Sequence, residues 1–241
     1  MKLLRTKQIK ILSVLVLVAC VAASVVMTSC KNEAEKAEID KKAAADVGFY
    51  EAYLADEIAP NIKQLVDAIP SDDPNYSKLV ESLCSNMGPV VCQAKKVDKV
   101  TIDEVFEKYG KDILPANLKL MWTLEPEVGR DGQECFSLVA LKTDDSGKPA
   151  MTGESITKAE TVYDKFSGYS ISIAMDKEGG KKFSWLTARN VGRPLAIVYK
   201  DKVLSYPTVN SQIDGGTLEI AGRFTPEETQ DFVSVLYGKK K

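Results

Sequence analysis

The residues with most chemical potential in this 241-residue chain are five cysteines, and the chain contains no histidine. Without histidine it lacks the commonest general base and the commonest metal ligand at neutral pH. Ser-His-Asp and Cys-His nucleophile systems, HExxH motifs and Cys/His zinc sites are therefore excluded. We expect no catalytic residue, no metal and no cofactor, and we predict a protein that acts by binding.

Cys30 ends an N-terminal segment that is typical of an export signal. Met1–Lys10 is basic, residues 11–27 are almost wholly apolar, and small residues lie directly before the cysteine. We predict that residues 1–29 are a lipoprotein signal peptide and that Cys30 is acylated, with Cys20 as an alternative after a shorter apolar stretch. An uncleaved anchor is the other interpretation, because an apolar run of 17 residues approaches the length of a spanning helix. Both place the body outside the cytoplasm, in a bacterial cell envelope.

The three remaining cysteines have structural interpretations. Cys84 and Cys92 flank a turn-like Asn-Met-Gly-Pro stretch and could close a short disulfide loop in an oxidising compartment. Two buried thiols are the alternative, because cysteine is commonly buried. Cys135 lies in an apolar run, which indicates a core position.

Two further patterns could be mistaken for catalytic motifs. Ser155–Lys158 matches the Ser-x-x-Lys signature of penicillin-recognising enzymes, but the companion Ser-Asp-Asn and Lys-Thr-Gly elements are missing. Three acidic pairs could suggest glycosidase carboxylates or a calcium site, but turn and helix-cap roles explain them better. These pairs are Asp72-Asp73, Asp144-Asp145 and Glu227-Glu228.

The charge balance excludes one class of partner. The formal net charge is −2, from 32 basic and 34 acidic side chains. Residues 1–29 hold four of the basic side chains and none of the acidic ones, so 28 basic side chains face 34 acidic ones in the remainder. A body of that sign lacks the basic footprint that nucleic acid requires. We therefore expect a protein partner, and a membrane reached through the N-terminal lipid.

The first half of the mature chain has a helical pattern. We expect residues 30–45, charged and rich in alanine, to form a tether between lipid and body. Apolar residues then recur at spacings of three and four, which predicts a small helical section over residues 46–97, broken or kinked at Pro60. Thr101 and Glu104 have capping-box spacing and predict the start of the next helix.

Residues 98–241 predict an α+β domain with a mixed sheet and packed helices. Residues 118–124, 135–142, 169–175, 195–199, 203–206 and 217–224 have strand patterns. Asp176 predicts the N-cap of a helix reaching about Asn190, and Thr225 with Glu228 predicts the capping box of a final helix. The interleaving of these strands and helices with tight turns is typical of α+β folds.

Several blocks in this domain resemble, in order, the head of the first periplasmic domain of the SecD protein-export subunit. They are Glu178-Gly179, Asn190–Val198, Val203–Pro207, Ile213–Gly216 and Ile220–Glu228. Upstream, Ile113–Trp122 is similar to the approach to that head in the fused SecDF form. The resemblance covers about residues 98–238. The chain departs from the family at Thr229, where alanine is usual, and it lacks the family's Asp-Leu-x-Gly-Gly block.

The resemblance implies a moving α+β head that contacts an emerging, unfolded preprotein. Family members couple this work to proton flow through transmembrane helices, and no segment after residue 30 is apolar enough for such a helix. We therefore expect a stand-alone, lipid-anchored head that binds extended polypeptide or a partner in the export machinery. The alternative is a structural or interaction lipoprotein that kept the fold without an export role.

Overall fold

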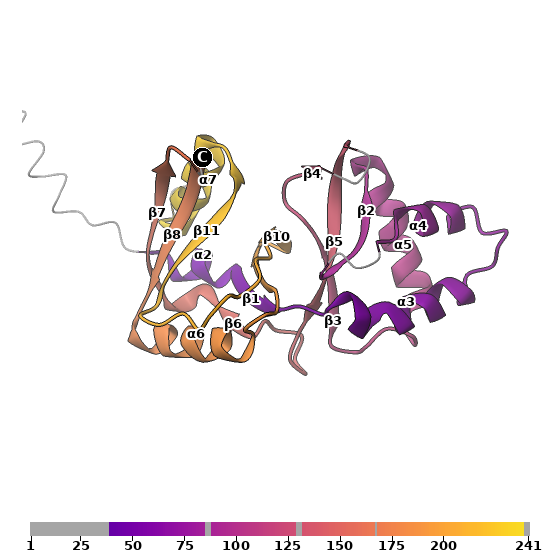
Figure 1. The fold of residues 1–241 in the computed structure, drawn as a ribbon, viewed down its shortest axis with the longest axis horizontal. Coiled ribbons are helices and arrows are strands. Elements are labelled where there is room, and N and C mark those ends of the chain that lie inside the picture. The colour runs from indigo at the N-terminus through magenta and orange to yellow at the C-terminus, as the bar shows by residue number, and fades with distance from the viewer. Residues whose placement is uncertain (1–38, 85–87, 129–131, 167, 239–241) are drawn as a thin grey trace, which may run out of the picture. The chain divides into compact units, whose positions relative to one another are not determined.

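A computed structural model describes residues 39–84, 88–128, 132–166 and 168–238. Residues 39–241 form one compact unit. Its architecture is α+β, as predicted, with three antiparallel sheets (Figure 1). The central sheet has the order β10-β9-β1-β6, the outer sheet has the order β11-β8-β7, and the base sheet has the order β2-β5-β3 with β4 also paired to β5.

The strands of the central sheet are β1 (Val47–Glu51), β6 (Met151–Thr152), β9 (Leu195–Tyr199) and β10 (Lys202–Ser205). Those of the outer sheet are β7 (Ile156–Asp164), β8 (Gly168–Met175) and β11 (Thr217–Phe224). Those of the base sheet are β2 (Val90–Ala94), β3 (Leu118–Trp122), β4 (Glu127–Val128) and β5 (Glu134–Lys142). The helices are α2 (Lys41–Ala45), α3 (Ala55–Ala68), α4 (Tyr76–Ser82), α5 (Lys99–Gly110), α6 (Lys177–Arg189) and α7 (Pro226–Leu236), with short 3₁₀ turns η1 (Lys96–Asp98) and η2 (Gly153–Ser155).

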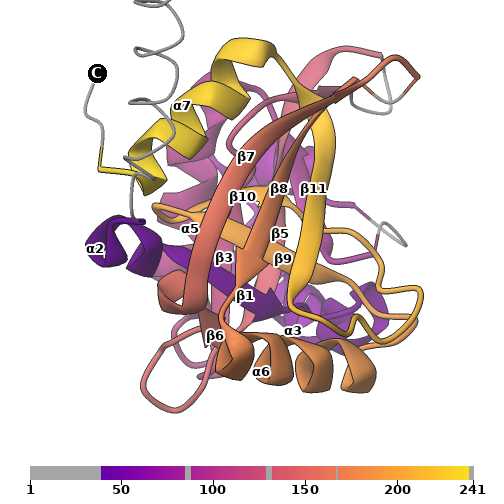
Figure 2. The same cartoon turned by 90° about the vertical axis from the view of Figure 1, so that its left-hand side faces the viewer.

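The central sheet is covered on both faces, which explains why β1 is almost entirely buried. Val47 and Phe49 join a core that includes side chains from α6, α7 and the outer sheet. Tyr50 and Ala52 point the other way and pack with Val139 and other residues of the base sheet. Alternate side chains of a strand point to opposite faces, so one strand contributes to two cores. Figure 2 shows the outer sheet with α6 and α7 beside it.

The base sheet is covered in the same alternating way. Leu138 and Ala140 of β5 pack with Leu65, Ile102 and Phe106 of the helices α3 and α5. Val139 and Leu141 lie on the opposite face, against the central sheet. The two sheets therefore bury apolar side chains between them, as in other face-to-face sheet packings.

The predicted helical section over residues 46–97 is wrong at both ends, because Val47–Glu51 and Val90–Ala94 are strands. Residues of β1 pair with β9 and β6, whose positions lie about a hundred or more residues further along the chain. A local apolar spacing cannot report such distant pairing, and tertiary contacts override it. Helices α3 and α4 confirm the helical prediction for the middle of the section.

Two finer predictions also need correction. Pro60 does not break its helix, because α3 continues through it to Ala68. Both Pro60 and Asp56 are exposed, so water can bond the Asp56 carbonyl that loses its donor. Thr101 does not cap α5: the 3₁₀ turn before the helix moves its start to Lys99.

The predicted tether over residues 30–45 extends too far. Ile39 is buried, and the Asp40 backbone N–H donates to the Leu236 carbonyl at 2.8 Å. The Asp40 carboxylate also caps α2, accepting from the Lys42 N–H at 2.9 Å. One large apolar residue in a charged segment is enough to join it to the core. The remainder of the predicted tether and the predicted signal peptide over residues 1–29 lie outside the described residues.

Strand β7 was not predicted, although it is one of the longest strands. Its exposed positions interrupt the apolar alternation, and Lys158 forms an ion pair with Glu160 at 2.8 Å.

The last helix, α7, begins as predicted: Thr225 Oγ1 accepts from the Glu228 N–H, and the Glu228 carboxylate accepts from the Thr225 N–H at 2.6 Å. Asp176 caps α6 through the Gly179 N–H at 2.7 Å, which confirms that prediction too.

Candidate functional site

A cleft of about 560 Å³ lies where the base sheet meets the central sheet, and we call it the Tyr206 cleft. One wall is the segment that follows β3, and the other is β10 with the residues after it; Figure 1 shows these elements near each other. A single parallel bridge, Thr123 to Val203, joins the walls, and the Leu124 N–H donates to the Val203 carbonyl at 2.8 Å. The lining residues are Gln93, Thr123, Leu124, Glu125, Pro126, Glu127, Val128, Val203, Leu204, Ser205, Tyr206, Pro207 and Phe224.

A chain of polar side chains crosses the floor of the cleft. The Tyr206 hydroxyl donates to the Glu127 carboxylate, with distances of 2.8 Å to Oε1 and 2.9 Å to Oε2. The fully buried Ser137 hydroxyl donates to the same carboxylate, and Gln93 Nε2 donates to Ser137 Oγ at 3.2 Å. The chain therefore ties β4 to the residue that follows β10.

Electrostatics keep the Tyr206 phenol protonated. Burial, followed by the negative charge of Glu127, raises the pKa of Tyr206 well above its ordinary value. Burial also raises the pKa of Glu125 at the rim, with a smaller effect from Glu228. Neither Glu125 nor Glu127 forms an ion pair with any residue that the structure describes. Tyr206 is consequently protonated at neutral pH and donates its hydroxyl hydrogen to the Glu127 carboxylate on the floor of the cleft.

The rim of the cleft combines apolar side chains with strand edges. Leu124 is 40% exposed and Val128 is 55% exposed. Strand β4 pairs with β5 and with no other strand in the described part of the chain. An unpaired strand edge beside apolar side chains is the arrangement that captures an extended polypeptide by strand addition.

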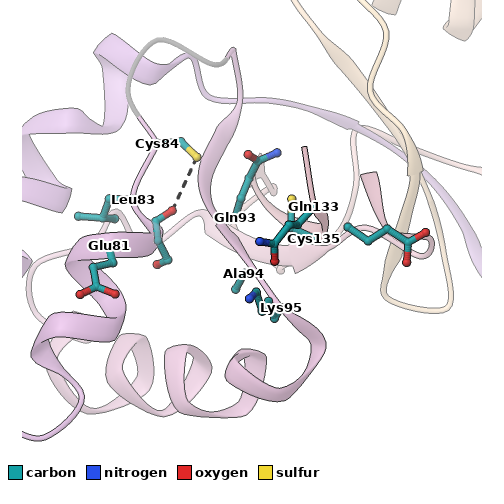
Figure 3. A pocket seen from close by; sticks show the side chains of 10 residues that line it. Glu81, Leu83, Cys84, Gln93, Ala94, Lys95, Gln133 and Cys135 are labelled. Carbon is teal, nitrogen blue, oxygen red and sulfur yellow. Dashed lines mark hydrogen bonds between the residues drawn. The ribbon is translucent and has the colours of Figure 1, made fainter. Parts of the chain in front are cut away.

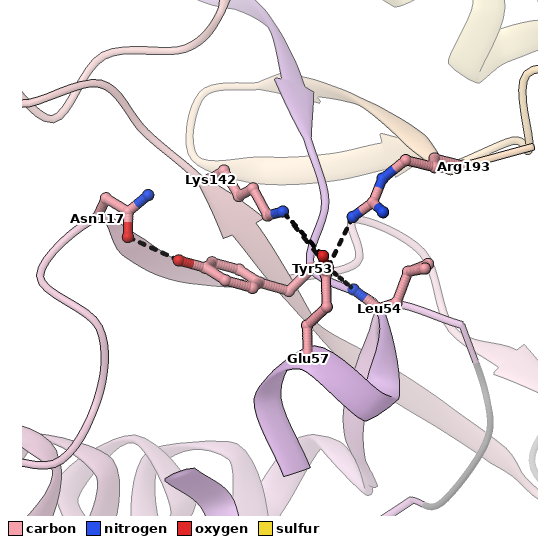
Figure 4. A network of polar contacts seen from close by, with 6 residues as sticks. All are labelled: Tyr53, Leu54, Glu57, Asn117, Lys142 and Arg193. Carbon is pink, nitrogen blue, oxygen red and sulfur yellow. Dashed lines mark hydrogen bonds and ion pairs between the residues drawn. The ribbon is translucent and has the colours of Figure 1, made fainter. Parts of the chain in front are cut away.

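A second polar contact joins the base to the central sheet at the N-terminus of α3 (Figure 4). The Glu57 carboxylate accepts from Arg193 Nη2 at 2.7 Å, from Lys142 Nζ at 3.4 Å and from the Leu54 N–H at 2.8 Å. Partial burial raises the pKa of Glu57, but the Leu54 N–H, Arg193 and Lys142 together outweigh that effect, and the net pKa is lowered. The Tyr53 hydroxyl beside it donates to Asn117 Oδ1 at 2.6 Å.

The structure places Cys84 and Cys92 on neighbouring chain segments. The Cys84 N–H donates to the Val91 carbonyl at 2.8 Å, and Leu83 pairs with Cys92 across an isolated antiparallel bridge. Cys84 Sγ lies 3.7 Å from the Ser82 carbonyl at the edge of a pocket of about 250 Å³ (Figure 3). Burial raises the pKa of the Cys92 thiol. Their disulfide remains a prediction, and a regular ladder would point the two side chains to opposite faces.

The other candidate residues either lie outside the described residues or have structural roles. Cys30 and Cys20 lie outside the described residues. Cys135 is buried, as expected. Asp144 accepts from two backbone N–H groups of its own turn, which confirms the structural interpretation of that acidic pair. Among the described residues there is no group of three potential metal-binding side chains. No helix in these same ranges is long and apolar enough to cross a membrane.

Sequence reasoning missed the residues that make both polar contacts. Tyr206 and Arg193 lie in the motif blocks quoted for the family resemblance, so a signal was present, although not for these roles. Glu57 and Glu127 carry no local signal, because their partners come from distant parts of the chain.

The motif blocks in the second half of the chain resemble the head subdomain of the protein-export subunits SecD and SecDF, and comparisons of sequence support that resemblance. Residues 131–239 match the family described as "SecDF, P1 head subdomain". The chain is 36% identical to the SecD translocase subunit of Rhodothermus marinus over 126 residues, which are 52% of this chain and 20% of that protein. It is 26% identical to SecD of Magnetococcus marinus over 217 residues, which are 85% of this chain and 38% of that protein.

A further relative, SecDF of Thermus thermophilus, is 35% identical over 96 residues, 40% of this chain and 13% of that protein. A solved structure of SecDF, described as a membrane component that enhances protein export, is 20% identical. The match covers 79% of this chain and 92% of that one, with a TM-score of 0.38. The chain thus spans well under half of the curated relatives described here.

Proposed function

We propose that this chain is a lipid-anchored protein of the bacterial envelope whose Tyr206 cleft binds extended polypeptide, either an export client or a partner in the export machinery. The observation that carries the proposal is the cleft itself. It is lined by Val203–Pro207, a block of the SecD type, and it has exposed apolar side chains beside a strand edge. The relatives are named protein translocase subunits, which supports a role in export.

Binding in the cleft needs no catalytic group. Apolar contacts at the rim would select unfolded over folded protein, because folded proteins bury their apolar side chains. Main-chain hydrogen bonds to a strand edge would be independent of client sequence. The protonated Tyr206 and its contact with Glu127 would hold the two walls at a fixed spacing.

The test uses the full chain in lipid nanodiscs, with an unfolded secretory protein as ligand and the same protein folded as control. We expect selective binding of the unfolded form, weakened about tenfold or more by Leu124→Asp with Val128→Asp, because charges then replace apolar contact area. Val191→Asp is the matched control, since Val191 is 50% exposed and does not line the cleft. If the cleft variant binds the unfolded protein as tightly as the wild type does, the polypeptide binds at another site.

A lipoprotein with a structural role is the second candidate, and one observation favours it. The solvent face of the outer sheet is polar: Ser172 pairs with Glu219 on one side and Glu160 on the other. If the wild-type chain binds neither form of the secretory protein, this second function replaces the first.

Acylation of Cys30 is tested separately by mass spectrometry of the membrane-extracted protein. We expect an N-terminal peptide that begins with a lipid-modified Cys30, and no such product from Cys30→Ser. A lipidated peptide that begins at Cys20 would support the alternative site. An unmodified chain that begins at Met1 would support the uncleaved anchor.

A further inference from the structure

The segment from the end of β2 to the start of α5 carries a basic and apolar patch that the polypeptide-binding proposal does not use. It consists of Lys95, Lys96, Val97, Lys99 and Val100, and we call it the Lys–Val patch. Val97 is 81% exposed and Val100 is 65% exposed, although both are purely apolar. They are three residues apart at the junction of a 3₁₀ turn and a helix, so their side chains share one side of that junction.

The lysines of the patch, Lys95, Lys96 and Lys99, are not held in ion pairs with residues that the structure describes. Three acids flank these lysines along the chain: Asp98 pairs with Lys78 at 3.1 Å, Asp103 accepts from Trp122 Nε1 at 2.8 Å, and Glu104 is exposed on α5. The five residues of the patch carry three positive charges and no negative one, on a chain with a negative net charge.

Besides partial burial, two other lysines, Lys202 and Lys96, lie close enough to Lys99 to lower its pKa. The Lys99 ammonium group lies 4.1 Å from the centre of the Phe136 ring and 5.2 Å from that of Trp122. Partial burial lowers the pKa of Lys99, and the positive charges of Lys202 and Lys96 lower it further against the opposing effect of Asp103. An anion at the surface would relieve this repulsion between lysines.

We propose that the Lys–Val patch docks on the surface of a bilayer that contains anionic phospholipid. Lysines beside exposed aliphatic side chains suit such a surface, because the ammonium groups meet the headgroups and the valines enter the interfacial region. An acidic protein segment would match the charge but would leave the two valines without an apolar environment. The proposed lipid anchor would also keep a bilayer at high local concentration around the body.

The test measures lysine acylation rates by mass spectrometry for the full chain in nanodiscs of phosphatidylcholine alone, or mixed with phosphatidylglycerol. We expect Lys95 and Lys96 to react about fivefold more slowly in the anionic discs, consistent with the usual attraction of one lysine to an anionic surface. The protection should disappear at high salt, because the attraction is screened. Lys181 and Lys182, exposed on α6, are the internal controls.

Val97→Ser with Val100→Ser should reduce the protection of Lys95 and Lys96 without changing their rates in phosphatidylcholine discs. Equal rates in the two kinds of disc would overturn the proposal, as would equal protection of Lys181 and Lys182. Protection by added poly-glutamate in the absence of any protection by anionic discs would also overturn it, in favour of an acidic protein partner. Because client binding is not measured, failure here leaves the polypeptide-binding proposal intact.

Discussion

Two carboxylates join the base of the molecule to the central sheet, and they do so by opposite means. Glu57 faces two cations, Arg193 and Lys142, at a partly exposed contact. Among the described residues, Glu127 accepts hydrogen bonds only from hydroxyl groups, those of Tyr206 and Ser137, at the floor of the Tyr206 cleft. Partly exposed ion pairs are weak because water and salt screen them. Glu127, in contrast, is partly buried and one of its donors, Ser137, is fully buried, so the loss of a donor there leaves a partly desolvated carboxylate without compensation. The cleft side should therefore be the firmer of the two connections.

Removal of the Tyr206 hydroxyl should give the largest effect. Tyr206→Phe keeps the ring that packs against the core between the two sheets, but it leaves Glu127 without one of its donors. We expect the free energy of unfolding to fall by about 2 kcal/mol, measured by urea denaturation. Tyr163→Phe is the control, since that exposed hydroxyl has no hydrogen-bond partner among the described residues. A loss no greater than that of the control would show that Glu127 does not depend on Tyr206.

The same contact should fail at alkaline pH. The pKa of Tyr206 in the folded protein is raised above its ordinary value of 10.0, so the folded state holds the proton more tightly than the unfolded state does. This contribution is fully present below about pH 10 and is lost as pH rises toward the folded pKa. The stability advantage of the wild type over Tyr206→Phe should shrink by about 1.4 kcal/mol for each pH unit above that point. Urea denaturation of both proteins at several alkaline pH values measures it, and an unchanged difference would contradict the raised pKa.

The Glu57 contact should be weaker when tested by mutation. Arg193→Met removes one of two cations and keeps an aliphatic side chain of similar length. We expect a loss of about 0.5–1 kcal/mol in the free energy of unfolding at low salt, and less at high salt. Lys182→Met, on the exposed face of α6, controls for the general loss of a positive charge. A loss larger than that of Tyr206→Phe would reverse the comparison between the two carboxylates.

Neither contact could be predicted from the sequence, although several of the surrounding elements could. Helices α6 and α7 could be predicted because Asp176 and Thr225 are N-cap residues that the local sequence identifies. Strand β1 could not, since its pairing with β9 joins residues that are far apart in the chain. Glu127, the partner of Tyr206, could not be predicted either, because it lies far from Tyr206 in the chain and in a two-residue strand that has no sequence pattern. Local chemistry fixes the ends of elements, whereas the cleft arises from long-range packing.

The smallest expected effect is the response of Glu57 to acid, which has the opposite sign to that of Tyr206. The pKa of Glu57 in the folded protein lies below its ordinary value of 4.5. Its contribution to stability is therefore fully present above about pH 4.5 and is lost as pH falls toward the folded pKa. Arg193→Met moves the folded pKa back toward the ordinary value, so the stability difference between wild type and variant should narrow below that pH.

Urea denaturation at a series of acidic pH values measures this narrowing, with Lys182→Met again as the control. Since other carboxylates titrate in the same range, only the difference between wild type and variant reports on Glu57. A difference that stays constant into acid would mean that Arg193 stabilises the fold through a contact other than its ion pair with Glu57. The polar contact at the N-terminus of α3 would then not depend on the charge of Glu57 for its contribution to stability.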